Sequence, residues 1–540
     1  MDQIDPKSGF NPQTRTFHSL RSPINLPPEN APLNAATYAL SLQSASPWSN
    51  PIALIDSATG RRVTYSEFAN RTQSLASYLQ RVVKLSKGDT AFVLCANSIR
   101  VPILYFSLLS IGVVISPANP ISSGSEIFRQ VEVSKPVIAF ATSSTAHKLP
   151  KLRYETIIID SPEFDSMTST KHETDSVEVS QHDLAAILYS SGTTGRTKGV
   201  MLTHRNLIGV VSGYHGVKEE RKSPAVALYP VPYSHVFGFF YCLKSVAVSE
   251  TVVVIGRFDV RKMVKAVEEF RVTHLSVVPP VVVAMTKGNI VDGFDLRSLE
   301  RVASGAAPLG KEVIAVFKQR FPGIMLSQGY GLTESTGAVF GLLRPEECLN
   351  WGSAGRLFPH CQAKIVDPTT GDALLPSQQG EIWLRGPTIM KGYINDPEAT
   401  LSTLVSDGWL RTGDLGYIDK DGYLHVIDRL KELIKYKGFQ VPPAELEQLL
   451  QSHPEITDAA VIPYPDEEAG ELPMAFVVRQ TGSSLSDAEI IDFVAKQVAP
   501  YKKIRRVAFV DSIPKTAAGK ILRRELKKIA LPVPGSSSKL

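Results

Sequence analysis

A loop rich in glycine and hydroxyl side chains is the part of this sequence best suited to chemistry. Residues 190–199 read Ser-Ser-Gly-Thr-Thr-Gly-Arg-Thr-Lys-Gly and follow the apolar run Ala185–Leu188. Glycines let the backbone turn its N–H groups toward an anion, hydroxyls add donors, and Lys198 supplies a movable positive charge. It is not the usual P-loop, because Thr197 stands where that motif requires glycine. The segment therefore predicts a polyphosphate-binding loop, with a flexible surface turn as the alternative.

Further segments that could bind a nucleotide follow this loop along the chain. Ser304–Leu309 contains small residues that allow a flat ligand to lie against the backbone. Gln328–Glu334 ends in a carboxylate, Glu334, that suits Mg²⁺, a hard cation that prefers carboxylate and phosphate oxygens. Asp414, in Trp409–Leu415, suits the two hydroxyls of a ribose. Taken singly, each segment has an ordinary explanation as a turn after a strand.

Two charged segments complete the series. Asp428–Gln440 is a run of alternating charges, and Ile513–Arg524 contains Lys520 directly after a glycine. By itself, the first predicts only a charged, solvent-exposed turn, and Lys515, Arg523 and Arg524 in the second predict a basic solvated face. In order and spelling, however, all these segments resemble the motifs of the adenylate-forming enzymes, the superfamily of acyl-CoA synthetases, firefly luciferase and peptide-synthetase adenylation domains. The resemblance extends from Ser190 to Lys520.

The resemblance implies ATP, Mg²⁺ and coenzyme A as cofactors, with Glu334 as the metal ligand. Tyr330 would cover one face of the adenine, and Thr333 would touch the α-phosphate. Arg257 would meet a CoA phosphate, with a solvated surface charge as the alternative. The residues assigned to ATP or CoA are Ser190, Ser191, Gly192, Thr193, Thr194, Gly195, Lys198, Gln328, Gly329, Tyr330, Thr333, Asp414, Arg429, Lys431, Arg257, Lys437 and Gly438.

The implied reaction has two halves. A substrate carboxylate attacks the α-phosphate of ATP, pyrophosphate leaves, and Lys520 stabilises the charge on the acyl and phosphate oxygens. The CoA thiol then attacks the acyl-adenylate and AMP leaves. For this second step the C-terminal domain would rotate about Lys431. The rotation would bring Lys437 and Gly438 to the site together with Lys435 and Gln440, which the resemblance assigns as catalytic residues of the thioester step.

The resemblance also implies an acyl pocket, with His235 at its entrance as a further catalytic residue. A packed structural histidine is the ordinary alternative for His235. The residues assigned to the pocket are His235, Phe237, Tyr241, Ala306, Gly331, Gly337 and Ala338.

Within the superfamily the chain most resembles plant peroxisomal 4-coumarate:CoA ligase-like proteins, but its predicted pocket differs from that of the true ligases. Phe237 stands where those ligases usually have tyrosine, and Ser335–Ala338 replaces their Ala-Gly-Pro-Val. Loss of a hydrogen-bond partner for a buried hydroxyl costs about 1–3 kcal/mol. We therefore expect weaker use of hydroxylated cinnamates and better use of less polar acids: cinnamate or benzoate, medium-chain fatty acids, or the cyclopentanone alkanoates that precede jasmonate. Alternatively, Phe237 only packs.

Other functions share these motifs. A luciferase-like oxygenase would oxidise the acyl-adenylate with O₂. A peptide-synthetase adenylation module would deliver it to a carrier domain, and no carrier segment follows Lys520. A non-catalytic nucleotide-binding scaffold would keep the fold without the chemistry. The joint presence of five residues argues against it: Lys198, Glu334, Asp414, Arg429 and Lys520.

Composition limits the remaining possibilities. The chain has 540 residues, 43% of them hydrophobic, and a net charge of +5, which is mild for this length and does not indicate a nucleic-acid partner. Its four cysteines are far apart and predict neither a disulfide framework nor a zinc site. Val101–Pro120 carries no charge, but serines, Gly112 and Pro117 interrupt it, so we predict a helix and a strand rather than a membrane span.

The sequence patterns predict an α/β fold, with βα sheets in the N-terminal part and a small α+β unit at the C-terminal end. The resemblance implies that a hinge joins this small C-terminal domain to a large N-terminal domain. Strand-like runs at Ala91–Leu94, Val113–Ile115 and Val137–Phe140 alternate with helical stretches, which is typical of a mostly parallel sheet. We place the ATP- and acyl-binding domain at residues 1–430 and the mobile domain with the catalytic lysine at 431–540. Residues before about Asn34 read as a loosely held lead-in.

The C-terminus carries a targeting signal. Ser538, Lys539 and Leu540 spell the peroxisomal address and follow a small, polar tail. We therefore expect a peroxisomal location, with the import receptor as the protein partner and a small carboxylic acid as the substrate.

Overall fold

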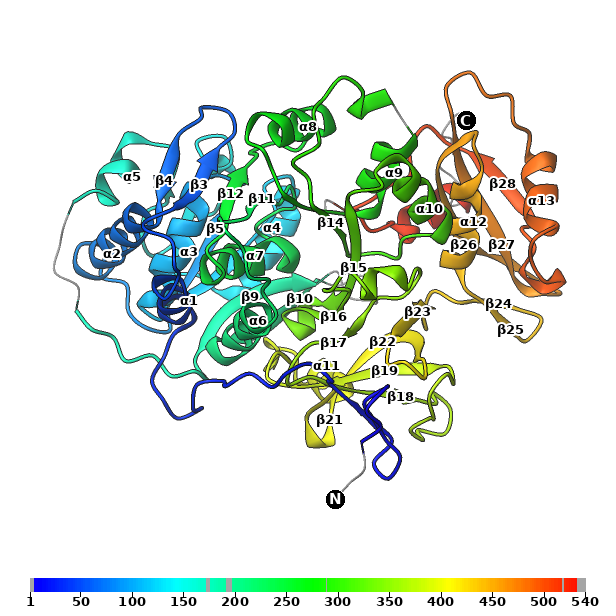
Figure 1. Ribbon diagram of the computed structural model, residues 1–540, viewed down its shortest axis with the longest axis horizontal. Coiled ribbons are helices and arrows are strands. Elements are labelled where there is room, and N and C mark those ends of the chain that lie inside the picture. Colours follow the sequence, from blue (N-terminus) through cyan, green and yellow to red (C-terminus); the bar gives the residue numbers. More distant parts are fainter. Residues whose placement is uncertain (1–3, 171–174, 191–196, 288, 517–518, 532–540) are drawn as a thin grey trace.

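The computed structural model describes residues 4–170, 175–190, 197–287, 289–516 and 519–531. Within these ranges the strands form four sheets, and the fourth belongs to a C-terminal part at one end of the molecule (Figure 1). The large N-terminal part and the small C-terminal part each contain both helices and sheets. The predicted α/β class, with a large N-terminal domain and a small α+β C-terminal domain, is therefore confirmed.

The first sheet carries the predicted phosphate loop. In spatial order its strands are β20 (Gly392–Tyr393), β10 (Lys198–Thr203), β9 (Leu184–Ser190), β6 (Val114–Pro117), β5 (Thr90–Leu94), β7 (Ile138–Ala141) and β8 (Ile157–Ile158). The accompanying helices are α2 (Tyr65–Arg81), α3 (Arg100–Ser110), α4 (Gly124–Ser134), α5 (Pro162–Met167) and α6 (His204–Gly216). The central strands β5, β6, β7 and β9 pair in parallel, as expected. The uncharged stretch Val101–Pro120 is indeed divided between α3 and β6.

The second sheet has a parallel centre and contributes residues to the site described below. Its strands in order are β17 (Arg356–Leu357), β16 (Gly337–Gly341), β15 (Met325–Leu332), β14 (Arg301–Ser304), β13 (His274–Val277), β11 (Val226–Leu228), β12 (Thr251–Val254), β3 (Ile52–Asp56) and β4 (Arg62–Thr64). Its helices are α1 (Ala35–Ser44), α7 (Val236–Ala247), α8 (Val260–Glu269), α9 (Pro279–Lys287) and α10 (Lys311–Arg320).

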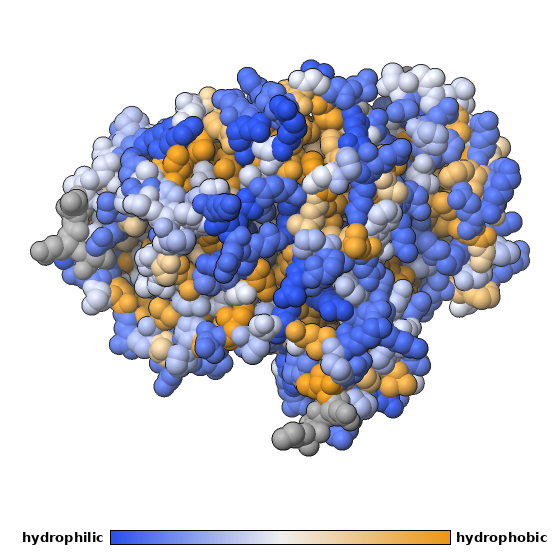
Figure 2. Space-filling model, viewed as in Figure 1, coloured by the Kyte–Doolittle hydropathy of each residue, from blue (hydrophilic) through white to orange (hydrophobic). Residues whose placement is uncertain are grey.

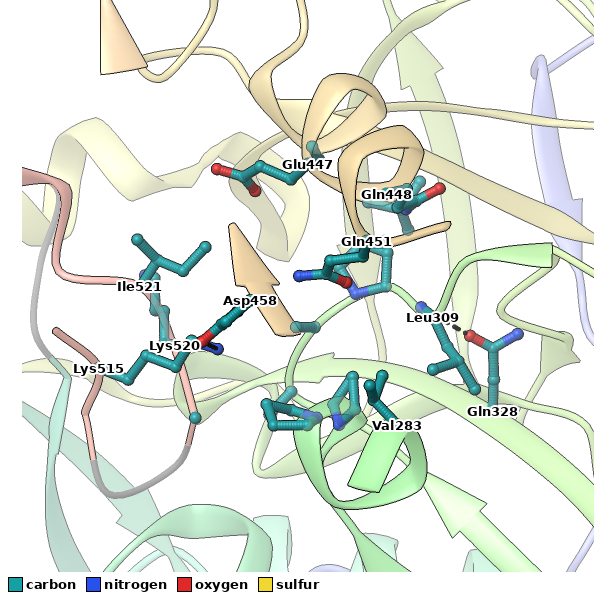
Figure 3. A pocket seen from close by; sticks show the side chains of 18 of the residues that line it. Val283, Leu309, Gln328, Glu447, Gln448, Gln451, Asp458, Lys515, Lys520 and Ile521 are labelled. Carbon is teal, nitrogen blue, oxygen red and sulfur yellow. Dashed lines mark hydrogen bonds and ion pairs between the residues drawn. The ribbon is translucent and has the colours of Figure 1, made fainter. Parts of the chain in front are cut away.

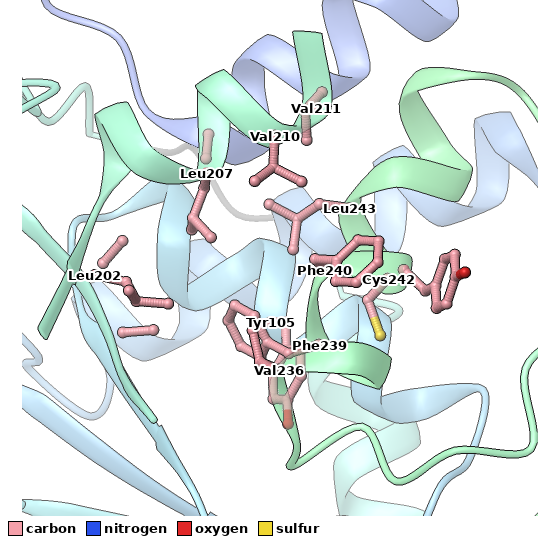
Figure 4. Close-up of a cluster of buried hydrophobic side chains, with 14 of the residues drawn as sticks. Tyr105, Leu202, Leu207, Val210, Val211, Val236, Phe239, Phe240, Cys242 and Leu243 are labelled. Atoms are coloured by element: carbon pink, nitrogen blue, oxygen red, sulfur yellow. The ribbon is translucent and has the colours of Figure 1, made fainter. Parts of the chain in front are cut away.

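The largest hydrophobic core joins these two sheets. Helix α7 lies at its centre, where Phe240 and Leu243 lie close to α6 residues such as Val210 (Figure 4). The ring of Phe239 packs against that of Tyr105 on α3, with 5.0 Å between ring centroids. Since interiors are packed as densely as organic crystals, this contact fixes α7, and with it the side chains that α7 presents to the site.

The third sheet is mainly antiparallel, and the βα rhythm did not predict it. Its path is β1 (Phe10–Asn11), β2 (Thr16–His18), β18 (Gln362–Val366), β19 (Gly380–Arg385), β22 (Trp409–Ile418) and β21 (Leu404–Val405), with β23 (Leu424–Arg429) beside β22 and helix α11 (Pro397–Thr403) next to it.

The N-terminal segment is part of this third sheet, so its description as a loose lead-in was wrong. Strand β2 pairs with β18, and Phe17 is buried. Arg21 forms a buried ion pair with Glu347 at 2.9 Å and also donates to the backbone carbonyl of Gly341. Buried charges need such partners, and these partners come from residues more than 300 positions away in the sequence, which local patterns do not reveal.

The fourth sheet forms the C-terminal part. Its strands are β25 (Phe439–Val441), β24 (Ile434–Tyr436), β27 (Gly470–Arg479), β26 (Ile456–Asp466) and β28 (Arg506–Phe509), and its helices are α12 (Pro443–Ser452), α13 (Asp487–Ala495) and α14 (Arg523–Ala530). Strand β23 ends in the third sheet at Arg429, and β24 begins in the fourth at Ile434. Residues 430–433 therefore connect the two parts, and Lys431 lies within this connection.

The surface is predominantly polar. Figure 2 shows hydrophilic residues over most of one face, with apolar residues in smaller groups among them. Among the described residues, no helix is both long and apolar enough to cross a bilayer. The cysteines Cys95, Cys242, Cys348 and Cys361 are buried and free.

Candidate active site

Two cavities meet beside the ends of β14 and β15. The first has a volume of about 730 Å³ and extends to the C-terminal domain, where Gln448 and Lys520 line it. The second, of about 540 Å³, runs along α7 within the N-terminal part. The residues that line both cavities are Ala306, Gln328, Gly329, Tyr330 and Gly331. All five were predicted to bind nucleotide or acyl group, and the structure brings them to the junction of the two spaces.

A cluster of polar side chains lies on the wall of the first cavity. Asp414 on β22 stands opposite Arg429 on β23 in the antiparallel register, and their side chains are 3.4 Å apart. The Tyr330 hydroxyl donates to Asp414 at 2.7 Å. Burial raises the pKa of Asp414 above its ordinary value, although Arg429 and Tyr330 act in the opposite direction. The cluster therefore holds a desolvated carboxylate that can accept hydrogen bonds from paired hydroxyls.

Lys520 reaches the first cavity from the C-terminal domain. Its neighbour Gly519 has φ of +78° and lies against Val278, the residue after β13, so a Cβ there would be 3.1 Å from a Val278 methyl group. Burial, and secondarily the charge of Arg429, lower the pKa of Lys520 to about 8. Figure 3 shows Lys520 among the residues that line this cavity, together with Asp458 and Lys515, whose side chains are 2.6 Å apart. The lysine thus lies where the two parts of the molecule meet.

The predicted phosphate loop connects two antiparallel strands. Ser190 at the end of β9 pairs in register with Lys198 at the start of β10. The Ser190 hydroxyl is buried without a hydrogen-bond partner among the described residues, which marks it as available to a ligand. Ser191, Gly192, Thr193, Thr194 and Gly195 lie outside the described residues.

One tyrosine that the sequence analysis missed connects the loop to the predicted metal ligand. The Tyr393 hydroxyl donates to Glu334 at 2.9 Å, and the Lys198 ammonium lies 4.5 Å from the centre of the Tyr393 ring. Thr333 is buried in the same short 3₁₀ turn as Glu334. Tyr393 follows a glycine in a short strand on the edge of the first sheet, and only the pairing of β20 with β10 places it here. Sequence spacing carries no signal of that pairing.

His235 and Phe237 lie at the opening of the second cavity. His235 caps α7, since its Nδ1 accepts the N–H of Phe237 at 3.2 Å, which leaves the ring proton on Nε2. Burial, and then the charge of Lys520, lower the pKa of His235 to about 4, so the ring is neutral at physiological pH. Phe237 lies against Gly305, where a Cβ would be 3.3 Å from the ring.

Aromatic rings form much of the second cavity. Tyr241 stacks on Tyr229 with 4.0 Å between ring centroids, and Phe237 lies 5.4 Å from Tyr241. Gly337 has φ of +112°, and a Cβ there would approach the Phe240 ring to 2.8 Å, so glycine is required. Ala338 also lines this cavity. The predicted acyl-pocket residues are thus together.

Other predicted residues lie away from both cavities in this structure. Lys435, Lys437, Gly438 and Gln440 are exposed on the β24–β25 hairpin, where Lys437 pairs with Glu468. Arg257 is exposed between β12 and α8.

Two basic side chains near Lys520 are not the solvated charges that the sequence suggested. Lys515 pairs with Asp458, and Arg523 is largely buried, with Glu432 at 2.5 Å and Glu447 at 2.7 Å. Glu432 lies in the connection between the two domains, so Arg523 ties that connection to the C-terminal domain. Their acidic partners come from distant segments, which explains why composition alone suggested a solvated face.

Comparison with known proteins identifies the class and then the family. Among solved structures, ATP-bound MatB from Rhodopseudomonas palustris superimposes with a TM-score of 0.81 at 27% identity, covering 92% of this chain and 99% of that one. The o-succinylbenzoate CoA synthetase MenE from Bacillus subtilis, in complex with its acyl-adenylate intermediate, superimposes with a TM-score of 0.79 at 27% identity, covering 93% of this chain and 99% of that one. The fold and site are thus those of an enzyme that forms acyl-adenylates.

The family follows from sequence. Residues 43–394 match the AMP-binding enzyme family and residues 445–520 match the AMP-binding enzyme C-terminal domain. The chain is 51% identical to "4-coumarate--CoA ligase-like 9" of Arabidopsis thaliana, covering 99% of this chain and 98% of that protein. It is 44% identical to "Peroxisomal OPC-8:0-CoA ligase 1" of the same plant, covering 100% of both. The chain belongs to the AMP-binding enzyme family.

Within that family it is an AMP-forming acid:CoA ligase that works through an acyl-adenylate and uses ATP, Mg²⁺ and coenzyme A. The residues present fit these molecules. The Ser190 hydroxyl, which has no hydrogen-bond partner in the described part of the chain, and Lys198 suit phosphate, and the Glu334 carboxylate suits a hard cation.

Proposed function

We propose that this ligase activates weakly polar carboxylic acids, with the reaction centre at the junction of the two cavities. The observation that carries the proposal is the set of five residues that line both cavities: Ala306, Gln328, Gly329, Tyr330 and Gly331. A nucleotide in the first cavity and an acid in the second meet there. His235 is neutral and uses Nδ1 to cap α7, so we assign it to positioning the acid rather than to proton transfer.

The first half-reaction depends on charge placement. As the carboxylate attacks the α-phosphate and pyrophosphate departs, negative charge is shared among phosphate oxygens, and preorganised donors stabilise it. We assign Lys520 to the acyl and α-phosphate oxygens, Lys198 and the 190–195 loop to the β- and γ-phosphates, and Asp414 to the ribose. Glu334 would hold Mg²⁺, which neutralises phosphate charge when bound.

The second half-reaction needs another orientation of the C-terminal domain. Lys520 fills the approach to the acyl-adenylate, whereas Lys435 and Gln440 are exposed on another face of the same domain. We propose that residues 431–540 rotate as a unit on residues 1–430, with Lys431 as the pivot. The rotation withdraws Lys520 and brings the β24–β25 hairpin, with Lys437 and Gly438, toward the site for the attack of the CoA thiol.

The walls near the junction favour acids without ring hydroxyls. Phe237 offers no hydrogen bond where a tyrosine would, and Gly337 and Ala338 leave room beside it. Cinnamate, medium-chain fatty acids and cyclopentanone alkanoates are the candidates.

A panel of these acids, assayed for thioester formation under one set of conditions, tests the choice. We expect an unsubstituted aromatic or an aliphatic acid to have the highest kcat/KM. If 4-coumarate exceeds all of them, the proposed substrate class is wrong.

We also propose a peroxisomal location and a role in metabolism there. Support comes from the terminal Ser538, Lys539 and Leu540, which lie outside the described residues, and from the peroxisomal relative. A fluorescent protein fused in front of this chain should enter peroxisomes, and deletion of Leu540 should return it to the cytosol. A cytosolic signal that does not change on deletion would refute the proposal.

A further inference from the structure

The far part of the second cavity, which we call the acyl cavity, contains charged side chains, unlike its opening beside Phe237. Lys244, in the last turn of α7, lines the cavity and forms an ion pair with Glu250, and their side chains are only 13% and 6% exposed. Three tyrosine rings surround the ammonium, those of Tyr214, Tyr229 and Tyr241, at 5.8, 5.7 and 5.8 Å from their centres. A buried charge is costly, so its place on a substrate cavity calls for an explanation.

The hydrogen bonds of this group leave one donor unused. The Lys244 ammonium donates to Glu250 and, at 3.2 Å, to the Tyr229 hydroxyl. That hydroxyl in turn donates to the other Glu250 oxygen at 2.6 Å. An ammonium carries three N–H groups, and among the described residues the third has no hydrogen-bonding partner. The cavity therefore offers a donor at this point, and a ligand with an acceptor can use it.

The surrounding charges are balanced. Arg301 pairs with Glu219 at 2.6 Å, and Arg221 pairs with Glu300 at 2.6 Å. Burial lowers the pKa of His274, which also lines the cavity, to about 4, so it is neutral at physiological pH. Lys244, Arg301 and Arg221 each have their own carboxylate, whereas Lys218, which also lines the cavity, is exposed to solvent. A second carboxylate on the substrate near Lys244 would find no uncompensated positive charge among these three and would face Glu250, so a neutral acceptor fits better.

We propose that Lys244, oriented by Glu250 and Tyr229, binds a ketone carbonyl in the tail of the acid. Seven residues of an α-helix span about 10 Å, so Lys244 lies about that far along α7 from Phe237 at the junction. The acid thus has its carboxylate at the junction, an apolar body beside the aromatic rings and a carbonyl at the far end. The inference rests on the proposed function and narrows its substrate class to keto acids with a long or ring-bearing tail.

A matched pair of substrates tests the proposal in the unmodified enzyme. One acid carries a cyclopentanone ring at the end of a medium-length alkyl chain, and the other has a cyclopentane ring in its place. A hydrogen bond from a charged donor predicts a kcat/KM about tenfold higher, or more, for the ketone. Equal values, or preference for the cyclopentane acid, would overturn the distal subsite while leaving the ligase activity established. No thioester from either acid would overturn the substrate proposal as well.

Substitutions test whether Lys244 causes the preference for the ketone. The pair Lys244→Met and Glu250→Gln removes the donor without leaving a buried unpaired carboxylate. We expect the ratio of the two kcat/KM values, ketone to cyclopentane acid, to fall to about one, and a circular dichroism spectrum like that of the wild type shows that the fold is intact. Lys262→Met, on the exposed side of α8, is the control and should keep the wild-type ratio. A double variant that still prefers the ketone would refute the role of Lys244. Because the comparison in wild type needs no variant, the proposal can be rejected even if the double variant does not fold.

Discussion

The two cavities are built in different ways. The first cavity, which we assign to the nucleotide, combines residues from the N-terminal sheets with Gln448 and Lys520 of the C-terminal domain, whereas the described lining of the second cavity, which we assign to the acid, comes only from residues 46–358. The position of the C-terminal domain therefore changes the first cavity and leaves the second intact. This separates rate from selectivity: changes in the first cavity should affect all acids alike, and changes in the second should alter the preference among acids.

Lys520→Ala should have the largest effect. Removing a preorganised positive charge from a phosphoryl-transfer site typically costs 10²–10³-fold in rate. Adenylate formation, measured as ATP–pyrophosphate exchange, should fall by about this factor for every acid.

Thioester formation from a supplied acyl-adenylate should be retained in this variant. Lys496→Ala, an exposed lysine of the same domain, serves as the control. Loss of the second half-reaction with the first preserved would contradict the assignment.

The pH dependence of adenylate formation should show the ionisation of Lys520. Because the pKa of Lys520 is lowered to about 8, its ammonium is present below pH 8 and is lost as the pH rises above it. The kcat/KM for ATP in the first half-reaction should therefore fall about tenfold per pH unit above pH 8. The fall should be the same for different acids.

Lys520→Arg provides the matched variant, since a guanidinium stays charged in this range. Its activity relative to its own maximum should remain level from pH 8 to 9. An identical fall in this variant would show that another group titrates.

Phe237→Tyr tests the prediction that changes in the second cavity alter the preference among acids. The added hydroxyl supplies a partner for a substrate hydroxyl, so the ratio of kcat/KM for 4-coumarate to that for cinnamate should rise several-fold. Phe321→Tyr, which adds the same group outside both cavities, should leave the ratio unchanged. If Phe237 only packs, the two variants will behave alike.

Lys287→Met should have the smallest effect. Lys287 on α9 donates to the carbonyls of Gln451 and Ile456, at the end of α12 and the start of β26, and thereby holds the C-terminal domain in the present orientation. Loss of these bonds should change the ratio of the two half-reaction rates about fivefold in favour of thioester formation. Lys262→Met is the control, and an unchanged ratio would show that Lys287 does not hold the domain.

The sequence predicted the parts of the site that rest on compact motifs and missed those that depend on distant pairings. Asp414 and Arg429 were found because each lies in a recognisable segment, and strand pairing then places them face to face. Tyr393 carries no local signal, because it reaches Glu334 through an edge strand. Lys244 was missed for another reason: its partner Glu250 lies only six residues further on, but the sequence does not reveal that the pair is buried on a cavity. The N-terminal segment was misjudged for the same reason as Tyr393, since Arg21 has its partners in residues 341–357.

The connection between Arg429 and Ile434 is short, and this has a consequence for the order of events. Four intervening residues reach at most about 14 Å, so the C-terminal domain is held on a short tether at high effective concentration. In the proposed cycle, its face with Lys520 and its face with the β24–β25 hairpin then compete for a single opening and exclude one another. This exclusion fixes the order of the two half-reactions, because the thiol can reach the site only after the adenylate has formed and Lys520 has withdrawn.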